Sequence, residues 1–176
     1  MGRVRRCPIG SLTVPCVRNS TGRILIVDSL ARSLRNRQRL LPVIGYGVTI
    51  DGRAETWQYQ YCDTATPPAT YWFHANSIGF GFDSTARMQV GSATITNHWR
   101  DNDSAIYIAE VNGGSDFRKN YPDFSISAVL GQPLVPNPST DWWITYRCMS
   151  KPSKSLLVGI DACPGSVVIP ANLQAR

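Results

Sequence analysis

Nine arginines near the amino terminus are the residues with the clearest chemical potential. Residues 1–40 hold them against one acidic residue, Asp28, for a net charge of +8, whereas residues 41–176 carry a net charge of −2. The guanidinium group is planar and donates paired hydrogen bonds that match phosphate oxygens. This segment therefore predicts contact with nucleic acid through Arg3, Arg5, Arg6, Arg18, Arg23, Arg32, Arg35, Arg37 and Arg39. A solvated face, an acidic protein partner and an anionic membrane surface are the alternatives.

Histidine and cysteine are the next candidates, because they can act as base and nucleophile. His74 and His98 are the two histidines of the chain, and either could pair with Cys62 if the fold brings them together. The sequence contains no hydrolase, metalloprotease, deaminase, P-loop or dinucleotide-binding motif. We therefore expect a protein that is not an enzyme and uses no cofactor, with both histidines serving in packing or at an interface.

Four oxygen-bearing residues could bind a cation. Asp101, Asp103, Asn112 and Asp116 offer the hard donors that calcium prefers, although their spacing is not that of an EF-hand loop. Aspartate and asparagine also form turns, so a plain turn is the competing interpretation. Asn19 and Asn102 each begin a short glycosylation pattern, which has meaning only in a secreted eukaryotic protein.

Five cysteines without a C-x-x-C pair argue against a structural zinc site. Cys148 and Cys163 end one predicted strand and precede the next, so they could form a disulfide in an oxidising compartment. Cys7 and Cys16 flank a proline-rich loop and could do the same. In a reducing compartment all of these cysteines would be thiols.

Short strands must position these residues. We expect the stretch 70–111 to form the centre of a sheet, because Ile78, Phe80 and Phe82 alternate with Gly79 and Gly81. This period places the three apolar side chains on one face, toward a core. The two glycines leave the other face bare, which predicts a close approach by another backbone, a bend or a bulge.

One helix is predicted, from Ile24 to Leu41, with leucines along one stripe, arginines on the other faces and Pro42 at its end. From Val43 onward, about nine or ten short strands separated by turn signals are expected, including a pair at 93–99 and 104–111 joined by residues 100–103. The predicted fold is all-β, mostly antiparallel, a β-sandwich or jelly roll. Residues 1–41 would form the basic arm and amphipathic helix, and residues 42–176 the β domain.

A basic arm followed by a β-sandwich is similar in layout to the coat proteins of small viruses. The resemblance implies a capsid-like structural subunit that forms homo-oligomers through its β domain, contacts nucleic acid through its arm and resides in a virion or assembled particle. One alternative is an extracellular or cell-surface adhesin of pilus type that binds carbohydrate through Trp99 or Trp143. Another is a nucleic-acid-binding β-protein that does not assemble, with Tyr59, Tyr61 or Trp72 stacking on bases. No apolar run reaches the ~20 residues of a membrane span, and no signal peptide is expected.

Overall fold

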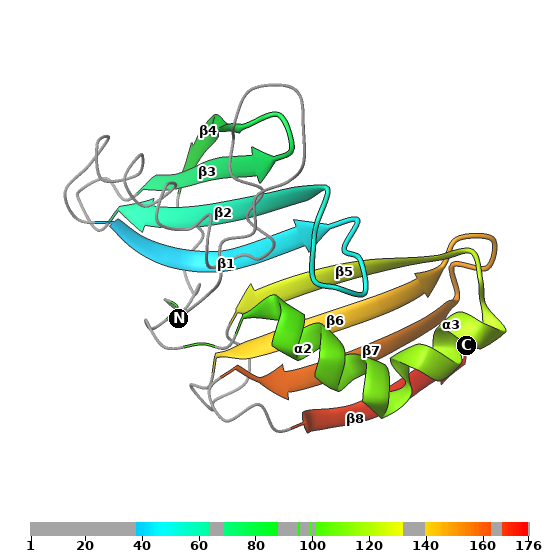
Figure 1. Ribbon diagram of the computed structural model, residues 1–176. Coiled ribbons are helices and arrows are strands. Elements are labelled where there is room, and N and C mark those ends of the chain that lie inside the picture. Colours follow the sequence, from blue (N-terminus) through cyan, green and yellow to red (C-terminus); the bar gives the residue numbers. More distant parts are fainter. Residues whose placement is uncertain are drawn as a thin grey trace.

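A computed structural model describes residues 38–63, 69–87, 95, 99, 101–131, 140–162 and 167–175. Its eight strands form one antiparallel sheet in the order β4-β3-β2-β1-β5-β6-β7-β8 (Figure 1). The strands are β1 (Gln38–Tyr46), β2 (Thr56–Asp63), β3 (Ala69–Asn76), β4 (Phe80–Arg87), β5 (Phe124–Gly131), β6 (Asp141–Cys148), β7 (Lys154–Asp161) and β8 (Val167–Ala175). Each half of the chain makes a four-stranded meander, and β1 pairs with β5 where the two meanders meet.

The mostly antiparallel β architecture predicted from the sequence is therefore confirmed, as one open sheet. Within the described ranges no second sheet faces this one, so the sandwich or jelly roll is not established. The dipeptide Asp51-Gly52, a type of sequence that favours hairpin turns, lies in the connection from β1 to β2, and Gly52 adopts the positive φ of 78° that such a turn favours.

Alternation along the strands places large side chains on one face of the sheet. On β2, Trp57, Tyr59 and Tyr61 are buried, and Trp57 meets Trp142 of β6 edge to face at a ring-centroid distance of 6.4 Å. Ile144 and Tyr146 of β6 continue the same buried face. This face therefore forms the core across the β1–β5 seam.

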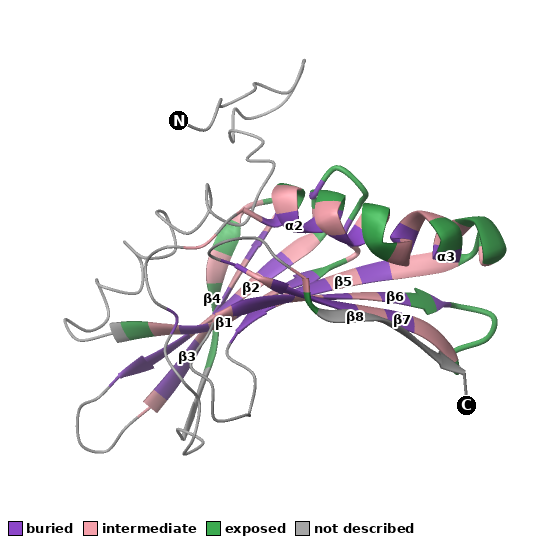
Figure 2. Ribbon diagram, turned by 90° about the horizontal axis from the view of Figure 1, so that it is seen from below, coloured by how far each residue is buried: buried purple, intermediate pink, exposed green. Residues whose placement is uncertain are grey.

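A helical layer covers part of that face. It consists of α2 (Asn102–Ala109), a wider turn η1 (Glu110–Gly114) and α3 (Ser115–Asn120). α2 and η1 pack on β6, β7 and β8 (Figure 1), and all of the layer lies on one side of the sheet (Figure 2). None of the described helices is long and apolar enough to cross a membrane.

The predicted strand at 104–111 is wrong, because this segment is helical. Tyr107, Ile108 and Val111 have high strand propensity, but Ala105, Ile106 and Ala109 are the buried residues, and their spacing is that of a helix. Residues 93–99, the predicted partner strand, lie outside the described residues except for Ile95 and Trp99.

The predicted helix at 24–41 is wrong over its last four residues, and residues 24–37 lie outside the described ranges. Gln38 begins β1, and Pro42 lies within that strand at a register shift between Leu40 and Val43 rather than at a helix end. A proline has no N–H to donate to the ladder and is tolerated at such an irregularity. The strand thus begins four residues before the predicted domain boundary.

The predicted central position of residues 78–82 is also wrong, because β4 is the last strand of the described sheet. Ile78, Phe80 and Phe82 are 89%, 41% and 49% exposed. Phe80 and Phe82 do alternate with Gly81 on β4, whereas Ile78 lies in the turn before that strand. A residue period of two does not reveal whether another element covers the apolar face. A bulge was expected here, and the register of the β3–β4 ladder does shift, between Trp72 and Phe73. Gly81 lies against the His74 ring, where an added Cβ would be 3.1 Å from Cε1, so the close approach is by a side chain.

Candidate functional site: the open face of the sheet

The face of the sheet turned away from the helices has no described element on it (Figure 2). Strand register places one row of residues side by side across it: His74, Gln58, Ile44, Val129 and Trp143. All five are half-buried rather than buried. The centre of this row is apolar and its β2–β3 end is polar. We call this side of the sheet, with the residues on it, the open face.

Further residues extend the apolar centre along the strands. Thr145 of β6 pairs with Leu157 of β7, and both are half-buried on the open face, one row from Trp143. A residue diagonal to another across an antiparallel pair lies about 7–8 Å away, within reach of a tryptophan. Ile44, Val129, Trp143 and Leu157 therefore make one continuous apolar patch, on which a flat partner surface could pack.

Charged groups lie at the ends of β6 and β7 rather than at the centre of the open face. Arg147, near the end of β6, is exposed and pairs with Ser155. Asp161, the last residue of β7, pairs with Asp141, the first residue of β6. Asp141 is buried and Asp161 is half-buried, so on β6 and β7 the open face carries the Arg147 cation at one end and the Asp161 carboxylate at the other.

On the opposite side of the sheet, Glu110 holds the helical layer in place. It accepts a 2.9 Å hydrogen bond from Tyr146 Oη and bonds from Arg118 Nε and Nη2, the shorter at 2.6 Å. Burial and the Glu110 carboxylate raise the pKa of Tyr146 well above its ordinary value. The Glu110 bond likewise raises the pKa of Arg118. The sequence analysis did not predict this network. Its only sequence signal is Tyr146, a residue in the alternating pattern of β6.

The structure does not bring Cys62 and His74 together. His74 of β3 lies opposite Gln58 of β2. Cys62 is four residues farther along β2, which places it about 13 Å from Gln58. The His74 Nδ1 atom instead contacts Asp83 Oδ1, and both side chains are about one-third exposed. Cys62 is buried, and burial raises the pKa of its thiol. His98 lies outside the described residues.

Of the nine arginines, Arg39 alone falls within the described residues. It lies on β1 opposite Cys62, and its side chain is exposed. Contact with nucleic acid stays a prediction for Arg39 and for Arg3, Arg5, Arg6, Arg18, Arg23, Arg32, Arg35 and Arg37, whose positions are outside the described ranges.

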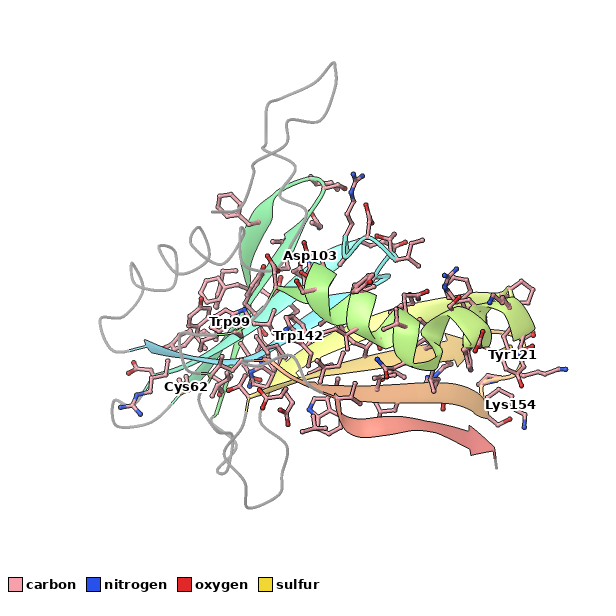
Figure 3. The ribbon with its side chains drawn as sticks, turned by 60° about the horizontal axis from the view of Figure 1, so that its bottom comes forward. Cys62, Trp99, Asp103, Tyr121, Trp142 and Lys154 are labelled. Carbon is pink, nitrogen blue, oxygen red and sulfur yellow. The ribbon has the colours of Figure 1, made fainter. Side chains whose placement is uncertain are left out.

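The four cation candidates are spread along the helical layer. Figure 3 shows Asp103 near the start of this layer and Tyr121 beyond its far end. Asp101 caps α2 at Asn102 N, whereas Asn112 donates to Ile108 O and Asp116 pairs with Lys119. At about 1.5 Å per residue, Asp103 and Asn112 lie roughly 13 Å apart. In the described part of the chain, no three acidic, histidine or cysteine residues form a group that could hold a metal ion.

The proposed disulfide between Cys148 and Cys163 gains no support. Cys148 has a free, buried thiol that contacts Asp123 Oδ1 at 3.3 Å. Cys163 lies outside the described residues, but the preceding Ala162 bonds to Thr140 O, at the other end of β6 from Cys148. Hydrogen bonds from Ser150 and then from the Cys148 thiol lower the pKa of Asp123 to about 2.

Burial decides which of the residues predicted to contact bases, sugars or a glycan are accessible. Tyr59 and Tyr61 are 0% and 2% exposed, so they cannot stack on bases, whereas Trp72 is half-buried on the open face. Trp99 packs against the core (Figure 3), and Trp143 alone of the two sugar-stacking candidates is on the open face. Asn102, a glycosylation candidate, is fully buried and donates to Gly52 O at 2.5 Å.

Comparison with known proteins adds no functional assignment: no family model, curated protein or solved structure matches this chain.

Proposed function

We propose that this chain is a structural coat subunit, which self-assembles through its sheet and contacts nucleic acid through its arginine-rich amino-terminal segment. The single observation that carries the proposal is the two-sided sheet. Helices cover the β6–β8 part of one face, while the other face presents a continuous apolar patch on which no described element packs. An apolar surface of this kind is typical of a protein-binding face.

The charge distribution supports the second half of the proposal. Residues 1–40 carry a net charge of +8 and residues 41–176 a net charge of −2. In the proposal the first segment binds phosphate and the second forms the assembly contacts. The finer fold, a sandwich of two sheets, belongs to the same proposal, because the described residues of one chain form a single sheet. In this proposal the chain is located in a virion or another assembled particle.

Nucleic-acid binding can be tested with Arg32, Arg35, Arg37 and Arg39 changed together to Glu. Anisotropy of a labelled single-stranded oligonucleotide would be measured over a range of salt concentrations. Each lost phosphate contact should reduce the slope of log K against log salt by about 0.7, so the variant should lose a slope of about 3.

A matched control changes four basic residues outside that segment to Glu. Arg53, Lys119, Lys151 and Lys154 suit this purpose, because they lie away from the centre of the open face; the first three are exposed and Lys154 is half-buried. Their reversal should leave most of the salt slope in place. Equal losses in the two variants, or no loss in the first, would remove the segment as the contact.

A further inference from the structure

The open face is large enough to form a stable interface by itself. Eight strands about 4.8 Å apart, each with about eight residues rising 3.3 Å, span roughly 900 Å². A standard specific interface takes about 800 Å² from each partner. One layer of sheet packed on the open face would therefore meet the size requirement without any other element.

The edges of the sheet are less suited to assembly than the open face. β8, the last strand on one side, contains Pro170, which has no N–H to offer an added strand. β4, the last strand on the other side, pairs with β3 through a register shift that disturbs its ladder. Both features are typical of edges that resist pairing with another strand, so association is directed to the face.

The charges at the ends of β6 and β7 indicate which partner would fit and in which orientation. A two-fold axis in the interface, perpendicular to the strands, reverses strand direction in the second copy while keeping β6 over β6. Arg147 of one copy would then approach the end of the sheet that holds Asp161 in the other. The apolar centres would meet, since Val129 and Trp143 lie between these ends.

We infer that two copies of this chain pack open face to open face about such an axis and form an intermolecular β-sandwich. The helical layers lie on the two outer sides of the dimer. This inference rests on the proposed function only in that both require self-association; it specifies which surface forms the contact. It also gives the predicted sandwich a second layer, supplied by the partner copy.

Sedimentation velocity on the full chain tests the contact, with nuclease treatment, reducing agent and high salt to separate it from nucleic-acid binding. The wild-type chain should sediment as a dimer, with twice the 19.4 kDa chain mass. Ser127→Arg and Thr145→Arg add a charge to half-buried polar positions of the open face, so they should yield monomers. Tyr107→Arg is the control on the helical side, where Tyr107 is 69% exposed, and it should stay dimeric.

Circular dichroism melting would accompany each variant, so that a monomer is scored only if it is folded. Arg147→Glu is a milder second probe at an exposed position, and it should raise the dimer dissociation constant by about tenfold while leaving the far-ultraviolet circular dichroism spectrum unchanged. Folded Ser127→Arg and Thr145→Arg chains that remain dimeric, or still form particles, would overturn the face-to-face contact and leave the coat proposal standing. A wild-type dimer that stays a dimer free of nucleic acid when the untreated chain is run at low salt would support the contact and overturn the coat proposal. A wild-type monomer throughout would overturn both.

Discussion

The backbone of Gly114 lies directly against the phenol of Tyr146, where the helical layer meets the sheet. A Cβ added at Gly114 would be 2.5 Å from Tyr146 Oη and 3.0 Å from Ala109 O. Because Tyr146 is buried and bonded to Glu110, its ring cannot easily move away. We expect Gly114→Ala to lower the free energy of unfolding by about 1–3 kcal/mol, as overpacking does, measured by denaturant titration.

Gly79→Ala is the matched control, because nothing lies within 4 Å of a Cβ added at that glycine. Its unfolding free energy should stay within about 0.5 kcal/mol of wild type. If the two variants lost the same stability, the close approach of η1 to β6 would not be what Gly114 provides.

The Asp123 carboxylate should titrate far below an ordinary aspartate. Its hydrogen bonds from Ser150 and Cys148 favour the ionised form and lower its pKa from 3.8 to about 2. The resulting stabilisation is present above pH 3.8 and is lost as the pH falls through about 2. A carboxyl-carbon NMR titration should give a midpoint near 2, and a midpoint at the ordinary value would mean that these bonds do not form in solution.

At the scale of elements, the start of α2 is tied to the β1–β2 hairpin. Asn102 is fully buried, and its Nδ2 atom donates to Gly52 O at 2.5 Å, in the turn between the two strands. Asn102→Ala would leave that carbonyl without this buried donor. We expect it to cost about 1–3 kcal/mol of unfolding free energy.

Asn112→Ala provides the comparison, since Asn112 donates a similar bond to Ile108 O but is exposed to water. Its cost should be about 0.5 kcal/mol or less, because water replaces the lost partner. Hydrogen exchange would add a local readout, because Asn102→Ala should speed amide exchange in the β1–β2 turn. An unchanged exchange rate there would show that the Asn102–Gly52 hydrogen bond does not hold this turn against α2.

The strands could largely be predicted from the sequence, because alternation is a local property. Trp57, Tyr59 and Tyr61 show it on β2, and Ile144 and Tyr146 show it on β6. The helix α2 was missed because its β-branched and aromatic residues outweighed two weaker signals. These were the capping residue Asp101 and the helical spacing of the buried alanines.

The candidate site could be predicted much less well than the strands. Which residues share the open face depends on long-range register, such as Ile44 beside Val129, and no local pattern encodes that pairing. The Glu110–Arg118–Tyr146 network likewise joins the helical layer to a strand 36 residues away in the chain. Burial, which excluded Tyr59 and Tyr61 as base-stacking residues, follows from that same assembly of elements.

At the scale of the whole molecule, the two properties that the proposed function requires lie in different parts of the chain. The arginine-rich segment supplies charge, and the described sheet supplies one face that helices partly cover and one open face. Assembly about nucleic acid needs both, because phosphate contact alone gives a binding protein and sheet contact alone gives an empty oligomer.

The most direct test of this central claim is light scattering coupled to size exclusion on the full chain, with the 260/280 nm absorbance ratio read across each peak at low and high salt. The account predicts a particle many times the 19.4 kDa chain mass that carries nucleic acid at low salt. Reversal of Arg32, Arg35, Arg37 and Arg39 should empty it while the sheet stays folded. A monomer or small oligomer free of nucleic acid at both salt concentrations would contradict the account.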